Sequence, residues 1–579
     1  MNQIELTTEQ AGPRDSNALN LVINAFAGSG KTTTLRAYAV ARPMSSMLYV
    51  AFNKVTADEA AASFPRNVEC RTMHSLAFTA VGKQYKHKLA QLRPNVVANS
   101  YKEKGVTVLT AHYLVKTVEA FMYSADLAIR DSHVPQEVPA ASRSHIAKGA
   151  QYLWNDMVDA KSTMPMTHDG YLKLFQLSKP VLSNRYDVIL LDEAQDTNPV
   201  TMDIVFRQSC GKVIVGDKHQ SIYAFRGCVN AMEMLKNAES HYLTQSMRFG
   251  AAVAEPATLL LRFLKGESRA VIGLGQMDAL PNKVDRSQPY TVICRTNAKV
   301  FGHAVRLLGE KKVHFVGGVE SYPLGKLEDV FHMWNGEKSR VKDAFYREFA
   351  DCEALEAYAR ETDEKEILSL ISVAREFKSD LPALIAQVKA AACEKLEDAD
   401  VILTTAHRSK GLQFRQVVLN DDFDDLVDGT GKLNIGDFEK FQQEVNLLYV
   451  AMTRAQRAIE LNTQFNDFAA AVRAGDVDPI GASSKTGKNE KVATQTASAA
   501  SSHAVGLSLA EKIGKMILRI GPLSCQAMGE RMDLSEETVA AEVVRMISNG
   551  DLSSLYFVAD GLVQAKLKAQ GYRSPEMAM

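Results

Sequence analysis

Residues 21–32 (LVINAFAGSGKT) combine an apolar strand, a glycine-rich turn and the first residues of a helix. This order constrains the fold strongly, because such a turn directs backbone N–H groups and the positive end of a helix at an anion. It predicts a loop that binds a nucleoside triphosphate, with Lys31 at the β- and γ-phosphates and the Thr32 hydroxyl on Mg²⁺. Ala25 stands where the usual pattern has its first glycine. The expected nucleotide-binding residues of the loop are Ala27, Gly28, Ser29, Gly30, Lys31, Thr32 and Thr33.

An acidic motif follows a second apolar stretch. Residues 186–191 (YDVILL) are typical of a buried strand, and the chain continues with Asp192, Glu193 and the letters AQD. At the tip of such a strand, Asp192 would hold Mg²⁺ through its water shell and Glu193 would polarise the attacking water. An acidic pair after a strand is usually a solvated turn, but the phosphate-binding loop favours the catalytic interpretation.

Strand and helix patterns alternate around these motifs, as in residues 47–51 (MLYVA) and 70–77 (CRTMHSLA). The alternation predicts an α/β fold with a parallel sheet. Phe52 and His74 follow expected strands, at the edge where open α/β sheets bind ligands. Their rings would stack the bases of a nucleic acid. A core phenylalanine and a hydrogen-bonded core histidine fit the same pattern.

Residues 213–227 (VIVGDKHQSIYAFRG) form another expected strand, a polar turn and an aromatic pair. Gln220 would sense the γ-phosphate, while Tyr223 and Phe225 would face nucleic acid. This arrangement would couple a nucleotide site to a nucleic-acid site. Taken alone, the two aromatic residues are more typical of a core.

Composition narrows the classes of function. The formal net charge is −1, from 67 Lys and Arg against 68 Asp and Glu, so nucleic-acid binding would need a local groove. The seven cysteines include no C-x-x-C pair, which argues against a zinc module or an iron–sulfur cluster. The N-terminal residues lack the pattern of a signal peptide, and no apolar run approaches the roughly 18 residues of a membrane span. We expect a cytoplasmic protein without a membrane partner, with a nuclear location still open.

Further motifs follow in a recognisable order: 243–250 (LTQSMRFG), 294–298 (CRTNA), 316–318 (VGG), 405–414 (TAHRSKGLQF) and 444–455 (EVNLLYVAMTRA). With the earlier motifs, the chain over residues 6–465 resembles superfamily 1A DNA helicases of the UvrD/Rep kind. Residues 51–54 (AFNK), 245–250 (QSMRFG) and 421–423 (DDF) are most similar to the eukaryotic F-box DNA helicases, although no F-box is expected before the motor.

The resemblance implies two RecA-like P-loop motor domains that bind ATP and Mg²⁺ between them. It implies that Lys31 and Thr32 bind phosphate and metal, that Asp192 binds the metal, and that Glu193 acts on the water. The residues implied around the γ-phosphate are Gln220, Arg248 and Arg454, whose guanidinium groups would stabilise the transition state. Gln10 would read adenine, although an ordinary helix start also explains it, and Gln413 would lie near the ribose.

The resemblance also implies a channel for single-stranded DNA. The residues that match it are Phe52, His74, Tyr223, Phe225, Arg226, Arg295, Asn297 and His407. The family implies an ATP-dependent 3′–5′ DNA helicase or single-strand translocase in repair or recombination, with single-stranded and 3′-tailed duplex DNA as partners. The alternative is an ATP-gated DNA-binding or translocase subunit of a larger complex, for example in defence against foreign DNA, with little strand separation of its own.

Three motifs depart from the family pattern, at five positions. Lys218 and His219 replace a usual acidic pair, Ser246 and Met247 replace Asn-Tyr, and Gln413 replaces a Glu. None of these changes removes a charged group that acts on the γ-phosphate, so we expect ATP hydrolysis to survive.

The resemblance divides the chain into domains. The expected division is motor domain 1A at 1–90 and 181–245, helical insertion 1B at 91–180, motor domain 2A at 246–320 and 396–475, a reduced helical insertion 2B at 321–395, a Ser- and Thr-rich linker at 476–504 and a winged-helix-like domain at 505–579. Insertion 2B is short, and no aromatic hairpin is evident after Arg454. Translocation is therefore a safer expectation than strand separation.

The winged-helix-like domain has two interpretations. Its second expected helix opens with Glu536 and Glu537, which would repel DNA and favour a protein partner or a structural role. Lys566, Lys568 and Arg573 keep a DNA contact open.

Overall fold

The computed structural model describes residues 5–223, 227, 230–276, 283–361 and 364–480. The chain divides into two compact units. The first comprises residues up to 261, residues 267–423 and residues 437–462; the second comprises residues 262–266, 424–436 and those from 463 onward. No helix of the described residues has both the length and the apolar character that crossing a bilayer requires.

The first unit contains two six-stranded sheets, and the first has the strand order β3-β2-β4-β5-β1-β6. Its strands are β1 (Asn20–Ala25), β2 (Met47–Ala51), β3 (Val68–Thr72), β4 (Val188–Leu191), β5 (Gly211–Gly216) and β6 (Glu239–Leu243). All pairs are parallel, and Leu21 of β1 lies opposite Val213 of β5 and Glu239 of β6. Strands β2, β4 and β5 are buried along their whole length, as expected of strands covered on both faces. The predicted parallel α/β fold is confirmed.

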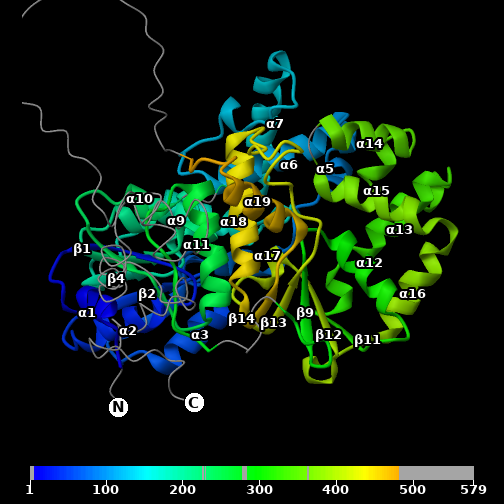
Figure 1. Ribbon diagram of the computed structural model, residues 1–579. Helices are drawn as coiled ribbons and strands as arrows, with labels where there is room; N and C mark the ends of the chain where they lie inside the picture. Colours follow the sequence, from blue (N-terminus) through cyan, green and yellow to red (C-terminus); the bar gives the residue numbers. More distant parts are fainter. Residues whose placement is uncertain (1–4, 224–226, 228–229, 277–282, 362–363, 481–579) are drawn as a thin grey trace, which may run out of the picture. The chain divides into compact units, whose positions relative to one another are not determined.

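Helices follow most of these strands and cover the sheet (Figure 1). Helix α1 (Thr8–Asp15) precedes β1. The helices that follow strands are α2 (Lys31–Val40), α3 (Lys54–Ser63), α4 (Met73–Ala80), α9 (Pro199–Phe206) and α10 (Ala231–Met234), with 3₁₀ turns η4 (Ala194–Asp196) and η5 (Lys218–Gln220). Because the strands are parallel, the turns into these helices meet at the carboxyl edge of the sheet, where ligands bind in such folds.

A helical segment separates β3 from β4, as expected for residues with few strand patterns. It contains η1 (Gly82–Lys88), α5 (Pro94–Ser100), η2 (Lys102–Lys104), α6 (Val108–Tyr123), η3 (Asp131–His133), α7 (Ala140–Val158) and α8 (His168–Leu177). Its core includes Phe121 of α6 and Trp154 of α7, whose rings meet edge to face with centroids 5.3 Å apart. Helix α8 also packs on α4 and α9, which ties the segment to the first sheet.

The second sheet has the strand order β11-β10-β12-β9-β13-β14 and is also parallel. Its strands are β9 (Tyr290–Cys294), β10 (Val313–Phe315), β11 (Ala392–Cys393), β12 (Val401–Thr405), β13 (Phe414–Leu419) and β14 (Ala455–Glu460). A separate parallel pair joins β7 (Gln245–Ser246) to β8 (Ile272–Gly273).

Helix α12 packs on β9 and β12 of the second sheet (Figure 1). The helices of this part are α11 (Ala251–Lys265), α12 (Asn297–Leu307), α13 (Leu324–Trp334), α14 (Cys352–Glu361), α15 (Lys365–Phe377), α16 (Leu381–Ala391), α17 (Ala406–Ser409) and α18 (Phe438–Met452). Short 3₁₀ turns lie at η7 (Val319–Ser321), η8 (Lys338–Arg340), η9 (Tyr346–Glu348), η10 (Lys378–Asp380) and η11 (Leu396–Asp398).

The second unit is built around α19 (Thr463–Ala474). Phe468 of α19 contacts the ring of Phe263, with centroids 6.4 Å apart, and the Ile480 N–H donates to the Phe263 carbonyl. The predicted winged-helix-like domain and residues 481–504 of the predicted linker lie outside the described residues.

Candidate functional site

The glycine-rich loop connects β1 to α2 at the carboxyl edge of the first sheet. Gly28 and Gly30 have φ angles of 75° and 79°, in the left-handed region that favours glycine. A Cβ atom would lie 2.4 Å from the Ser246 Oγ at Gly28, and 2.5 Å from the Gln10 Nε2 at Gly30. At Gly28 conformation and space both require glycine, because the Cβ would also lie 2.6 Å from the Arg248 Cβ; at Gly30 the left-handed conformation favours it.

A hydroxyl and a carboxylate meet where a metal ion is expected. The Thr32 hydroxyl donates to Asp192 Oδ2 at 2.9 Å, and the Tyr49 hydroxyl donates to the same oxygen at 2.7 Å. Asp192 follows β4 and is buried. Hard oxygen donors suit Mg²⁺, which usually takes one or two protein groups together with substrate phosphates and water. Thr32 and Asp192 therefore fit Mg²⁺ bound with a nucleotide.

Lys31 and Glu193 form an ion pair beside this position, with Nζ 3.2 Å from Oε1. Burial opposes the charge of Lys31, but the carboxylates of Glu193, Asp217 and Asp192 hold its pKa above the usual value. Burial also opposes the charge of Glu193, but Lys31 and Lys410 hold its pKa below the usual value. Burial and repulsion by Glu193 raise the pKa of Asp192. Glu193 is therefore the carboxylate that stays ionised to accept a proton or orient water.

The backbone of Glu193 is strained, with φ 51° and ψ 45°. A left-handed residue other than glycine costs on the order of 1–3 kcal/mol, and such residues concentrate at functional sites. Two hydrogen bonds hold it: the Glu193 N–H donates to Asp192 Oδ1 at 2.9 Å, and Gln195 Nε2 donates to Glu193 Oε2 at 2.6 Å. These two hydrogen bonds therefore hold the strained backbone in place and fix the direction of the Glu193 carboxylate.

The other predicted nucleotide-binding residues differ in their surroundings. Gln10 lies in a capping box with Thr7 at the start of α1, and its Nε2 also donates to the Ser29 carbonyl at 3.2 Å. Gln10 thus lies at a helix start and also contacts the loop, and its contact with adenine stays a prediction. The remaining residues are Ala27, whose N–H donates to the Tyr449 hydroxyl at 3.3 Å, Thr33, in the first turn of α2, and Gln413, which is exposed and accepts from Gln456.

One arginine binds a glutamine next to the loop, and a second arginine binds the residue that precedes the first. Arg454 lies between α18 and β14, is 1% exposed, and donates through Nη2 to Gln220 Oε1 at 3.0 Å. Gln220 Nε2 donates in turn to Asp217 Oδ2 at 2.7 Å. Arg248 Nη1 donates to the Thr453 carbonyl at 3.0 Å. Burial and repulsion by Arg248 lower the pKa of Arg454 to about 9, so this guanidinium stays charged at neutral pH.

Lys410 completes this network, although no role was predicted for it from the sequence. It follows α17, and its ammonium group donates to Asp196 Oδ2 and to the Gln220 carbonyl. The same group lies 5.0 Å from the centroid of the Tyr223 ring. One side chain thus contacts the acidic motif after β4, the Gln220 backbone and the ring of Tyr223, which is expected to stack on DNA bases. The signal was its position between His407 and Gln413 in a single motif.

Two family models match the chain: the UvrD/REP helicase N-terminal domain at residues 158–242 and the UvrD-like helicase C-terminal domain at residues 329–463. The chain belongs to the UvrD/Rep helicase family. It is 34% identical over 540 residues to F-box DNA helicase 1 of Gallus gallus, a match covering 84% of this chain and 52% of the relative. It is 32% identical over 487 residues to F-box DNA helicase protein 1 of Schizosaccharomyces pombe, covering 76% of this chain and 55% of the relative. The chain thus spans about half the length of these relatives, and the predicted family is confirmed.

In this UvrD/Rep chain, helix caps position four of the predicted DNA-binding residues. The N-caps of α3, α4, α12 and α17 are Asn53, Thr72, Thr296 and Thr405, and each side chain accepts a backbone N–H of the first turn. Such a cap fixes the residues beside it at the junction of a strand and a helix. The residues so placed are Phe52, His74, Asn297 and His407.

Three predicted DNA-binding rings form a row. The Phe52 and Tyr223 rings are stacked, with centroids 5.8 Å apart and planes 16° apart, and the His407 ring lies 6.4 Å from Tyr223. Phe52 is 43% exposed, so the alternative of a core phenylalanine is wrong. Burial and the Arg295 guanidinium lower the pKa of His407 to about 4, so its ring is neutral at physiological pH. The remaining aromatic prediction, Phe225, lies with Arg226 outside the described residues.

Arg295 and Asn297 are paired with carboxylates. Arg295 donates to both oxygens of Glu444, at 2.9 and 2.8 Å, and Asn297 Nδ2 donates to Glu366 Oε1 at 3.0 Å. A DNA phosphate that reaches Arg295 would compete with Glu444. His74 is also paired, with Nε2 3.0 Å from Asp169 Oδ1, and its side chain is 40% exposed.

The departure from the family at Lys218 and His219 has a structural counterpart. Lys218 Nζ and His219 Nε2 lie 2.8 and 3.2 Å from the same oxygen of Glu267, a buried residue 48 positions after His219. The Arg269 N–H donates to the other oxygen at 3.2 Å. A carboxylate from another segment therefore balances the two basic residues that replace an acidic pair.

Proposed function

We propose that the chain is an ATP-dependent motor that moves 3′ to 5′ along single-stranded DNA, separates duplexes with a 3′ tail, and acts in DNA repair or recombination. One observation carries the proposal: Gln220 bonds to Arg454, and three residues later Tyr223 stacks on Phe52. A change of contacts at the γ-phosphate would reach the aromatic row through this short segment. The names of the related proteins, both DNA helicases, support the same activity.

Each side chain then has a role in hydrolysis. Lys31 binds the β- and γ-phosphates and Glu193 orients the attacking water. Arg248 and Arg454 stabilise the charge that develops on the transferred phosphoryl group. Mg²⁺, bound at Thr32 and Asp192, would neutralise phosphate charge.

ATP hydrolysis with and without single-stranded DNA tests the proposal, together with release of a labelled strand from duplexes bearing a 3′ or a 5′ tail. DNA-stimulated hydrolysis and release from the 3′-tailed duplex alone are expected. Strong stimulation without release would restrict the activity to translocation. Release from the 5′-tailed duplex alone would contradict the proposed 3′-to-5′ direction. Equal hydrolysis rates with and without single-stranded DNA would contradict the proposed motor activity.

Replacing Phe52 with alanine is expected to weaken single-strand affinity by about 1–3 kcal/mol, the usual contribution of one stacked base. The physical reason is the loss of an exposed ring from the row formed with Tyr223. Fluorescence anisotropy with a labelled oligo-dT measures it. The matched control is Phe438→Ala, another exposed phenylalanine, at the start of α18. Equal affinities for the Phe52 variant and wild type would remove Phe52 from the DNA surface.

DNA-stimulated hydrolysis is expected to fall as the pH drops below about 6. Burial, only partly offset by Lys410, raises the pKa of Asp196 to about 6. The carboxyl group therefore gains a proton as the pH falls through this value, and the neutral group no longer pairs with the Lys410 ammonium. The raised pKa means that the folded chain favours the protonated form of Asp196. Protonation of this group therefore stabilises the folded chain at low pH, and that contribution is lost as the pH rises through about 6.

The pH dependence of the stimulated rate measures this effect, with circular dichroism to verify folding at each pH. Asp196→Asn has no proton to gain, so its rate should be low throughout and show no inflection near pH 6. An inflection that persists in this variant would assign the titration to another group.

A further inference from the structure

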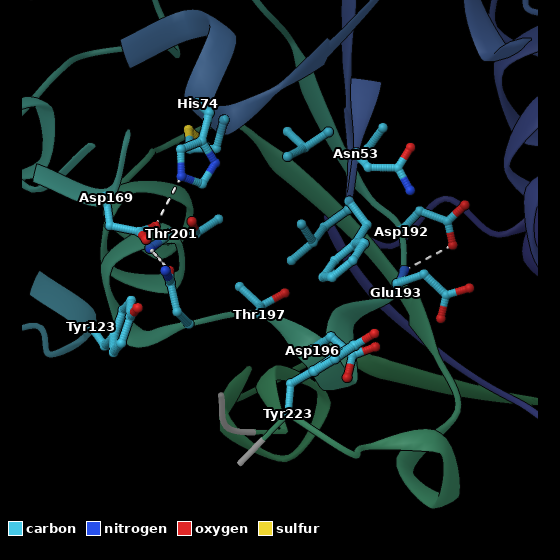
Figure 2. A pocket seen from close by; sticks show the side chains of 16 residues that line it. Asn53, His74, Tyr123, Asp169, Asp192, Glu193, Asp196, Thr197, Thr201 and Tyr223 are labelled. Atoms are coloured by element: carbon cyan, nitrogen blue, oxygen red, sulfur yellow. Dashed lines mark hydrogen bonds and ion pairs between the residues drawn. The ribbon is translucent and has the colours of Figure 1, made fainter. Parts of the chain in front are cut away.

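A pocket of about 300 Å³ opens at the carboxyl edge of the first sheet (Figure 2). Asp192 and Glu193 lie at one end, and His74 and Asp169 lie at the other. The volume is at the lower end of the range for small-molecule sites. The phosphate chemistry proposed above uses only the first end, so the end with His74 and Asp169 needs its own explanation.

The charge of the pocket disfavours phosphate. Four carboxylates line it, and the described lining residues include no lysine or arginine; the four are Asp169, Asp192, Glu193 and Asp196. Lys31 pairs with Glu193 and Lys410 pairs with Asp196, so Asp169 is the carboxylate that would repel a DNA phosphate at the end with His74. Phe52 and Tyr223, the stacked pair, also line the pocket and offer a surface for a flat, neutral group. These features together suit a nucleobase turned away from its phosphates.

At the end with His74, the polar groups of the pocket combine one carboxylate acceptor, Asp169, with amide donors. The amide oxygens of Asn53 and Asn198 accept the N–H groups of Thr56 and Thr201, each at 2.9 Å, to cap α3 and α9. The NH₂ group is therefore the part of each amide that serves as a donor. Asp169 is the acceptor, and its contact with His74 at 3.0 Å orients its carboxylate.

We propose that this pocket holds one base of the bound single strand and that Asp169 favours bases with an exocyclic amino group, cytosine above thymine. A carboxylate accepts a hydrogen bond from the N4 amino group of cytosine. Thymine carries a carbonyl oxygen at that position, which a carboxylate repels. Asn53 and Asn198 would donate to the ring nitrogen and carbonyl of the same base. The inference rests on the proposed function, because it needs single-stranded DNA at Phe52 and Tyr223.

Anisotropy titrations of the full chain with labelled oligo-dC and oligo-dT of about 20 nucleotides test the inference. The wild type should bind oligo-dC about three- to tenfold more tightly, a part of the discrimination that a good base contact gives. Asp169→Asn, whose amide can accept or donate, should bring the ratio of the two affinities close to one. The ratio compares two ligands on one preparation, so a loss of folded protein cancels.

Asp58→Asn is the matched control, because Asp58 is an exposed carboxylate on α3 that pairs with Lys54. This variant should keep the wild-type ratio. Equal wild-type affinities for the two oligonucleotides, or a preference that survives in Asp169→Asn, would overturn the inference and leave the proposed function standing. Binding of neither oligonucleotide would contradict the proposed function and this inference with it.

Discussion

Replacing Arg454 with alanine should lower the turnover of ATP by about a thousandfold or more, while nucleotide binding persists. An arginine aimed at the transferred phosphoryl group contributes about 10³–10⁵ to the rate, because it neutralises charge that is greatest in the transition state. Arg454 already donates to Gln220 and lies near Arg248, as such a role requires. Steady-state hydrolysis with single-stranded DNA gives the rate, and titration with a fluorescent ATP analogue gives binding.

The Arg454 variant needs two controls, because this side chain is fully buried and also donates to the carbonyls of Leu412 and Val450. Alanine leaves these groups unpaired, at a cost of about 1–3 kcal/mol each, so the folded fraction must be measured. Arg454→Lys keeps the charge without the planar fork and should remain strongly impaired. Arg457→Ala, on β14 and partly exposed, should turn over normally. Near-normal turnover in a folded Arg454→Ala protein would contradict the assignment.

The secondary structure of the motor could be predicted where the local pattern was strong. Residues 324–334 were expected to form a helix, and α13 has these bounds because its apolar residues recur at helical spacing. Residues 186–191 were expected to form a strand, and β4 covers the last four of them. The parallel order of the first sheet followed from the alternation of strands and helices, and the family resemblance implied the second motor domain. The domain boundaries and the C-terminal winged helix remain predictions.

Site residues could be predicted where a local strand or loop pattern positions them. They could not be predicted where segments far apart in the sequence come together. Lys31, Asp192 and Glu193 directly follow strand or loop patterns, so sequence alone places them at one sheet edge. Lys410 reaches Asp196 across 214 residues, and Glu267 reaches His219 across 48. No local periodicity marks either contact, because each depends on how separate segments pack.

Lys31→Ala should reduce ATP turnover by at least about a thousandfold and leave single-strand binding largely intact. The variant loses the ammonium group that would bind the β- and γ-phosphates. It also loses the partner 3.2 Å from Glu193, which helps to keep the pKa of that carboxyl low. The pKa of Glu193 should therefore rise, although Lys410 continues to lower it. Hydrolysis assays and anisotropy with oligo-dT measure the two effects separately.

Lys54→Ala is the control for the Lys31 variant, since Lys54 is an exposed lysine that pairs with Asp58 at the start of α3. It should retain both activities. Normal turnover in Lys31→Ala would mean that the glycine-rich loop does not hold the hydrolysed phosphates. Loss of oligo-dT binding in the folded variant would mean that Lys31 supports the row of Phe52, Tyr223 and His407 as well as the nucleotide. The separation of the two activities therefore tests whether ATP and DNA occupy distinct surfaces joined by the segment from Gln220 to Tyr223.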